Sequence, residues 1–197
     1  MMRALAATLV ATTLTSGAAA QGCPTATDLE NGIRLTRLDP MFSLVVQQTP
    51  EGLSEARVME RNGTPEEVDT LYVHPLAVSS RVVQNGMLTI DYEDDTSGLD
   101  DLLGNQTWSS TITLSQNGNP FTMGTYTATL TGTGQATIGE CNYDVWRVRD
   151  LMMLDNGAAI HFEKSYAPEL GLILGSIQLD ADNQPMGSVF FDEIVAE

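Results

Sequence analysis

Apolar and polar residues alternate along many short stretches of the chain. Leu88, Ile90 and Tyr92 share one face of a stretch whose intervening residues face the other way, and the same alternation recurs over residues 107–114. A period of two residues is typical of a β-strand with one buried and one solvent-facing side. These stretches therefore predict an antiparallel sheet that buries one of its faces.

The dipeptide Asn-Gly separates many of these stretches. Both residues tolerate the positive φ angles of a tight hairpin turn, so Asn-Gly between alternating stretches predicts a β-hairpin. The dipeptide occurs at positions 31–32, 62–63, 85–86, 117–118 and 156–157. We therefore expect each strand to pair with the next one along the chain, which gives a meander.

The predicted fold is all-β, a single antiparallel meander of about 10–12 strands. A sheet of this length needs protected edges, which favours a strongly curved sheet or an up-and-down barrel. Residues 93–105 are expected to hold at most one short helix, capped by Thr96 or Ser97. Gly132–Gly134 is expected to be a turn, and the last strand to cover Ser188–Val195.

The N-terminus has the pattern of a secretory signal peptide. Arg3 precedes a short apolar run, and Ala18 and Ala20 provide the small residues of a cleavage site after residue 20. We expect residues 1–20 to be removed and residues 21–197 to form one β domain with an irregular lead-in at 21–31. No later segment is long and apolar enough to predict a transmembrane helix. The expected location is periplasmic or secreted.

Cys23 and Cys141 are the only two cysteines. An even count in an oxidising compartment predicts one disulfide between them. The alternative is a lipid anchor on Cys23, which would follow the signal peptide closely and leave Cys141 as a free thiol.

The chain is strongly acidic, with 26 acidic and nine basic residues and a net charge of −17. Nucleic acid binding needs a basic surface, so this charge excludes nucleic acid as an expected partner and disfavours anionic lipid surfaces. Charge of this size also keeps a β-rich protein soluble.

No catalytic or metal-binding pattern is present. The acidic residues at 91–101 begin like an EF-hand, but Thr96 occupies the glycine position and Leu102 the final glutamate position. A loose cation site and a solvated acidic loop remain open there. His74 and His161 have no nucleophile pattern beside them, and two scattered histidines are too few for zinc. We therefore assign no catalytic residue, metal or cofactor, and the sequence favours a protein that is not an enzyme.

Arg147 and Arg149 lie two residues apart in a predicted strand of a chain with few basic residues. With Trp146 and Tyr166 they are the candidate ligand-binding residues, because arginines inside a concave sheet can hold an anionic group. The alternative is that both arginines pair with neighbouring carboxylates on the solvent-facing side.

Residues 166–174, YAPELGLIL, follow a strand that contains Cys141, Trp146 and Val148. This ending resembles the C-terminal parts of many largely uncharacterised exported bacterial β-proteins, in which a YAPELG-type break links two late strands. The hairpin meander is similar to the curved half-barrels of periplasmic lipoprotein carriers and lipid-binding lipoproteins. The second resemblance implies a concave sheet that holds a lipid-like ligand.

Three classes of function follow from these observations. The favoured one is a secreted or periplasmic binding protein that holds an apolar or amphipathic, lipid-like molecule in the concavity. The second is a structural or adaptor protein that docks on a partner protein of the cell envelope through its sheet. The third is a hydrolase or isomerase of a type that the sequence does not reveal.

Overall fold

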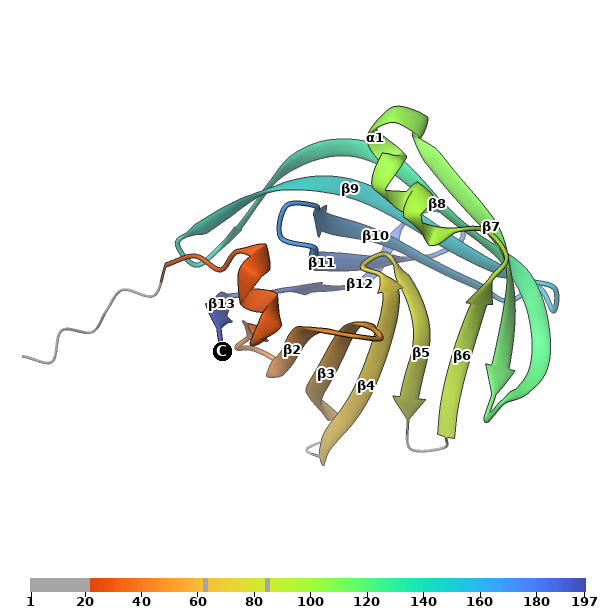
Figure 1. Ribbon diagram of the computed structural model, residues 1–197, viewed down its shortest axis with the longest axis horizontal. Coiled ribbons are helices and arrows are strands. Elements are labelled where there is room, and N and C mark those ends of the chain that lie inside the picture. The colour runs from red at the N-terminus through yellow and green to blue at the C-terminus, as the bar shows by residue number, and fades with distance from the viewer. Residues whose placement is uncertain (1–21, 62–63, 84–85) are drawn as a thin grey trace, which may run out of the picture.

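The computed structural model describes residues 22–61, 64–83 and 86–197 (Figure 1). The expected signal peptide, residues 1–20, lies outside this part of the chain. The described strands, thirteen in number, form one antiparallel sheet in which neighbours in the sequence pair with each other from β1 to β12. The predicted all-β meander is thus confirmed, with one strand more than the upper end of the expected range.

The first seven strands are β1 (Ile33–Arg37), β2 (Phe42–Thr49), β3 (Gly52–Arg61), β4 (Thr64–His74), β5 (Ala77–Val83), β6 (Gly86–Tyr92) and β7 (Thr107–Gln116). The remaining six are β8 (Asn119–Ile138), β9 (Cys141–Leu154), β10 (Ala159–Ala167), β11 (Leu172–Leu179), β12 (Pro185–Phe190) and β13 (Glu193–Ala196). The long strands β8 and β9 arch across the molecule, and β4–β6 lie in front of β10–β12 (Figure 1).

The end of the chain connects the two edges of this curled sheet. Strand β12 pairs only with β11, whereas β13 returns to the other edge and pairs with β1. Between them, the backbone N–H of Asp192 donates to the carbonyl of Thr36 at 2.8 Å. The Asp192 carboxylate accepts a 2.8 Å bond from the backbone N–H of Leu38. Arg37 also reaches the carbonyl of Ser188 at 3.2 Å. Side chains therefore bridge the seam, although no ladder between β12 and β1 closes the sheet.

The prediction of one continuous final strand over Ser188–Val195 was wrong. This segment is divided into β12 and β13, because the chain changes from one edge of the sheet to the other at Phe191 and Asp192. The expected turn at Gly132–Gly134 was also wrong, since β8 continues through it to Ile138. The pairing of β8 with β9 shifts by one residue between Leu130 and Gly132, so this region is a bulge inside a long bent strand.

Two of the Asn-Gly pairs lie in hairpin turns, as predicted, and a third does not. Asn117 and Gly118 both have positive φ, 51° and 79°, and form the tight β7–β8 hairpin turn. Gly157 also has positive φ and lies in the β9–β10 turn. The Asn31-Gly32 pair is not a hairpin turn, because it joins a helical segment to β1. Residues 62–63 lie outside the described part of the chain.

Three short helical segments accompany the sheet: η1 (Ala26–Glu30), η2 (Thr96–Asp101) and α1 (Leu102–Asn105). The last two occupy the stretch where one short helix was expected. The N-cap of η2 is Asp95, rather than the predicted Thr96 or Ser97, because the Asp95 carboxylate accepts a 3.0 Å hydrogen bond from the backbone N–H of Ser97. Leu99 and Leu102 of this η2–α1 segment are fully buried.

The buried side chains form two clusters. The first contains Ile33, Leu35, Phe42 and Leu44 from the early strands, together with residues of β11 and β13. The second contains Leu76, Leu99, Leu102 and Ile112, so it packs beneath the η2–α1 segment. Each cluster draws on strands far apart in the sequence, because the curl of the sheet brings them together.

The predicted disulfide is confirmed. Cys23 is bonded to Cys141, which lies 118 positions further along the chain, and the two Cα atoms are 5.5 Å apart. The bond holds the N-terminal lead-in against the start of β9, where the Tyr143 hydroxyl also donates to the carbonyl of Pro24 at 3.0 Å. Since the sulfur of Cys23 is in the disulfide, it cannot also carry a thioether-linked lipid.

Candidate functional site

A cavity of about 290 Å3 lies inside the curled sheet, between the two buried clusters. Phe42 and Leu44 of the first cluster and Leu76, Ile90 and Leu114 of the second all contribute to its lining. Most of the lining residues are aliphatic or aromatic. An apolar cavity with a few polar groups is the usual form of a small-molecule site.

Strands β3–β5 place a polar group on this lining, Glu55, Arg57, Tyr72 and Arg81. Together with the buried Thr70 beside them, we call these residues the arginine wall. The sheet register pairs Glu55 with Thr70, and Thr70 with Arg81, so these three residues form a row across neighbouring strands. The guanidinium of Arg57 lies 2.5 Å from Glu55, and the Tyr72 hydroxyl donates to Glu55 at 3.0 Å. Nε of Arg81 donates to the Thr70 hydroxyl at 3.2 Å.

The pKa of Tyr72 reflects its burial and the charged side chains around it. Burial is the main cause that raises the pKa of Tyr72, and the negative charge of Glu55 raises it further. The positive charges of Arg57 and Arg81 act in the opposite direction but do not outweigh the burial. Tyr72 therefore stays protonated at neutral pH and acts as a hydrogen-bond donor.

A β-bulge directs Arg81 into the cavity. Leu71 pairs with Ser80, but Tyr72 pairs with Val78, so Ser79 is an extra residue in β5. The Ser79 hydroxyl donates to the carbonyl of Leu71 at 3.0 Å within the bulge. Because one added residue reverses the direction of the following side chains, Val78 and Arg81 both line the cavity although they are three residues apart.

A second polar group lies on β8–β10 and consists of Tyr126, Asp150 and Lys164, which we call the lysine wall. Nζ of Lys164 lies 2.5 Å from Oδ2 of Asp150, and the Tyr126 hydroxyl is 3.1 Å from the same oxygen. The Tyr126 hydroxyl also lies 2.7 Å from the carbonyl of Leu76. Burial is the main cause that raises the pKa of Tyr126 far above its ordinary value, with the charge of Asp150 next.

Each wall retains one buried polar atom without a hydrogen-bond partner. These atoms are Nε of Arg57, a donor, and Oδ1 of Asp150, an acceptor. A buried polar atom without a partner is uncommon in native proteins and costs free energy. Both atoms are closed off from solvent, so they mark a free-energy cost inside the two walls rather than open contact points of the cavity.

The η2–α1 segment contacts β4 beside this cavity. Nε2 of His74 on β4 lies 3.2 Å from Oδ1 of Asp100 in η2, and Nδ1 of His74 accepts a 3.1 Å bond from the backbone N–H of Leu76. Burial lowers the pKa of His74, although Asp100 opposes this shift. His74 is therefore neutral at pH 7, with its proton on Nε2, and has the role of a structural hydrogen-bond donor.

Ile160 marks the mouth of the cavity. It lines the cavity although 45% of its surface is exposed, and it lies at the start of β10 beside the β9–β10 turn. Met153, its near neighbour on the same hairpin, is equally exposed at 45% but does not contribute to the lining.

The four residues predicted to bind a ligand lie elsewhere. Arg147 is exposed on β9, and Arg149 is 3.0 Å from Glu163 of β10 in a partly exposed ion pair. Trp146 packs edge-to-face on the buried Tyr166, with their ring centroids 5.7 Å apart. None of the four belongs to the lining of the cavity. Their role in ligand binding stays a prediction.

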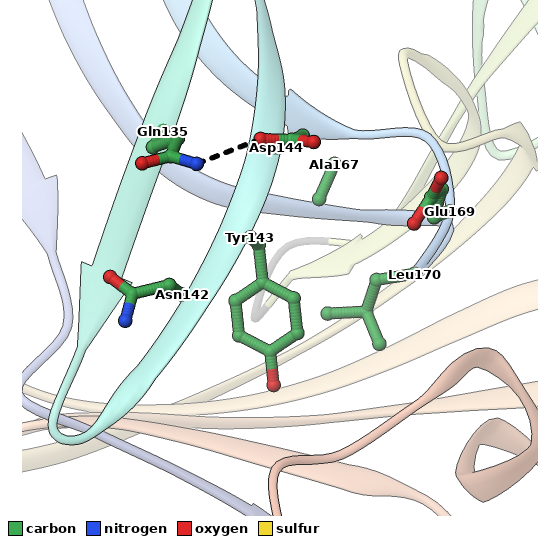
Figure 2. Close-up of a pocket in the computed structure, with 7 residues that line it drawn as sticks. All are labelled: Gln135, Asn142, Tyr143, Asp144, Ala167, Glu169 and Leu170. Atoms are coloured by element: carbon green, nitrogen blue, oxygen red, sulfur yellow. Dashed lines mark hydrogen bonds between the residues drawn. The ribbon is translucent and has the colours of Figure 1, made fainter.

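A second, smaller hollow of about 200 Å3 lies between the β8–β9 hairpin and the β10–β11 turn (Figure 2). Gln135 donates to Asp144 at 3.1 Å across its edge, and Glu169 and Tyr143 also line it. Its lining is mainly polar and contains two carboxylates but no basic side chain. The interior cavity, with its apolar surface and its paired charges, is therefore the stronger candidate site.

The described residues 22–61, 64–83 and 86–197 contain no group of three or more histidine, cysteine, aspartate or glutamate side chains arranged to hold a metal ion. Within the same residues, no helix has the length and apolar character needed to span a membrane.

Comparison with known proteins gives one structural match to report. No family model matches the chain, and no curated protein matches its sequence. In structure, the chain is similar to the hypothetical lipoprotein YmcC from Escherichia coli (K12), with a TM-score of 0.46 and 12% sequence identity. The match covers 79% of this chain and 81% of that one. A similarity of this size does not establish a shared family or function.

Proposed function

We propose that the protein is an exported, non-enzymatic binding protein that holds an apolar or amphipathic, lipid-like molecule inside its curled sheet. The cavity of about 290 Å3 is the observation that carries the proposal, because its lining is mostly apolar and contains two small polar groups. Apolar surface provides most of the affinity in such a site, and a few polar groups orient the ligand.

The pattern of the N-terminus and the disulfide support the exported location. A charged residue, a short apolar run and an Ala-x-Ala site precede Cys23. A disulfide such as Cys23–Cys141 persists in the periplasm or outside the cell and is rare in a reducing cytosol.

A matched pair of substitutions on β5 tests whether the cavity binds apolar molecules. Val78 lines the cavity, whereas Val82 on the same strand is 47% exposed and does not line it. We expect N-phenyl-1-naphthylamine, a neutral apolar fluorophore, to bind the wild-type protein and to be excluded by Val78→Trp, whose indole fills the cavity. The same change at Val82 is expected to leave binding intact.

A second pair keeps the test informative if Val78→Trp does not fold. Ile160→Gln puts an amide at the mouth of the cavity, and Met153→Gln makes the same change on the outer side of the same hairpin. We expect only Ile160→Gln to weaken binding of the fluorophore. If neither cavity variant differs from its control, or if the wild-type protein does not bind the fluorophore, the proposal is wrong.

A further inference from the structure

The charged side chains that line the cavity have a net positive charge, although the whole chain has a net charge of −17. The charged side chains of its lining are Glu55, Arg57, Arg81, Asp150 and Lys164. Arg57 is paired with Glu55, and Lys164 is paired with Asp150. Among the described residues Arg81 has no carboxylate within ion-pair distance, and its Nε donates to the uncharged hydroxyl of Thr70. The excess charge therefore lies on Arg81.

The surroundings of Arg81 favour an anion. A partly buried charge without a counter-ion costs free energy in a largely apolar cavity. Nε of Arg81 is held by Thr70, which leaves the terminal nitrogens of the guanidinium for a ligand. The other polar groups of the arginine wall are already engaged, because Arg57 is paired with Glu55 and the Tyr72 hydroxyl donates to the same carboxylate. Arg81 is therefore the group of this wall that is left for an anion.

The rest of the lining suits a single alkyl chain. Three apolar side chains of β9 and β10, Met152, Ile160 and Phe162, line the cavity next to the paired charges of the lysine wall. A volume of about 290 Å3 is at the small end of the range for ligand pockets. One chain with a compact headgroup fits this volume, whereas a two-chain lipid needs more space than the cavity provides.

We propose that the ligand is a single-chain amphiphile with an anionic headgroup, which binds the guanidinium of Arg81 while the chain lies along the apolar residues of β9 and β10. This inference rests on the proposed function and adds the chemical class of the ligand. Charge-assisted hydrogen bonds from a guanidinium to an anionic oxygen are among the strongest that proteins form.

Three amphiphiles with the same twelve-carbon chain separate the headgroup from the chain: dodecanoate, 1-dodecanol and dodecyltrimethylammonium. Each is titrated, below its micelle concentration, against the wild-type protein loaded with N-phenyl-1-naphthylamine. We expect dodecanoate to displace the fluorophore at about tenfold lower concentration than 1-dodecanol, the difference typical of one charge-assisted hydrogen bond. Dodecyltrimethylammonium is expected to be the weakest competitor.

Arg81→Gln is expected to abolish the preference for dodecanoate while the variant still binds the fluorophore. Arg34→Gln, at an exposed ion pair with Glu197 and outside the lining, is the control and is expected to retain the preference. Equal displacement by dodecanoate and 1-dodecanol would overturn this inference but not the proposed function. A preference that survives in Arg81→Gln or is lost in Arg34→Gln would also overturn it. Failure of the wild-type protein to bind the fluorophore would instead contradict the proposed function.

Discussion

Nε2 of His74 on β4 lies 3.2 Å from Oδ1 of Asp100 in η2, although strands β5 and β6 come between these two residues along the chain. The contact holds the η2–α1 segment against the sheet. His74 itself is only 7% exposed, and its other ring nitrogen accepts a bond from the backbone of Leu76. Protonation of His74 is therefore incompatible with the bond to Leu76.

This arrangement predicts that acid destabilises the protein. The folded-state pKa of His74 is lowered from its ordinary value of 6.5, so the unfolded chain binds a proton more readily than the folded chain. The contribution of His74 to the free energy of unfolding is therefore complete above pH 6.5 and decreases as the pH falls towards the folded-state pKa. Urea unfolding between pH 7.5 and 5 measures this loss.

The control for the pH prediction is His74→Gln, which has no proton to take up in this range. We expect its free energy of unfolding to change less than that of the wild-type protein between pH 7 and 5.5. A wild-type protein that becomes more stable over the same interval would contradict the assignment of a lowered pKa to His74.

The disulfide is expected to be a major contribution to stability. It closes a loop of 118 residues, for which the chain-entropy model gives a stabilisation of about 4–5 kcal/mol. The double variant Cys23→Ser with Cys141→Ser should lose about this much free energy of unfolding in a guanidinium titration. Reductant should have the same effect on the wild-type protein and none on the variant. Equal stability of the reduced and oxidised protein would show that the bond contributes nothing.

Two neighbouring leucines test the packing of the η2–α1 segment. Leu102 is fully buried in the second cluster, whereas Leu103 is 52% exposed. Leu102→Ala is expected to cost about 2–5 kcal/mol of unfolding free energy, the usual range for a buried leucine. Leu103→Ala should change it by less than about 0.5 kcal/mol, because the side chain is on the surface. Similar effects at both positions would mean that the segment does not pack as described.

The seam of the sheet is expected to open locally when Asp192 is changed. Its carboxylate accepts the bond from the Leu38 N–H, so Asp192→Ala leaves that amide without its partner. Amide hydrogen exchange at Leu38 and along β13 should become faster, because the free energy of local opening decreases by about 1 kcal/mol. Glu193→Ala, on the next exposed residue, is the control. Unchanged exchange at Leu38 in Asp192→Ala would show that the contact does not hold the seam.

Alternation and turn residues were sufficient to predict the class and order of the fold. Leu88, Ile90 and Tyr92 all line the cavity, as their shared face predicted. The break at Ala167-Pro168 also lies where it was expected, between β10 and β11. The errors occurred where the backbone departs from a regular strand. Gly132 is in a bulge and not in a turn, because glycine is equally compatible with both.

The candidate site was harder to predict for a related reason. Arg81 lines the cavity only because Ser79 forms a bulge, and nothing in the local sequence distinguishes this serine from an ordinary strand residue. Lys164 did carry a signal: it is the only lysine, and it lies two residues from Phe162 on the same face. Its partner Asp150 comes from the preceding strand, β9, so the pair depends on sheet register and could not be predicted from either strand alone.

Native mass spectrometry with a twelve-carbon amphiphile tests most directly whether the interior of the sheet is a binding site. The wild-type protein is mixed with dodecanoate or 1-dodecanol and compared with Val78→Trp and Val82→Trp. We predict one bound amphiphile per chain for the wild-type protein and Val82→Trp, and none for Val78→Trp. If Val78→Trp binds as much amphiphile as the wild-type protein, or if no form of the protein binds either compound, the interior cavity is not a ligand site.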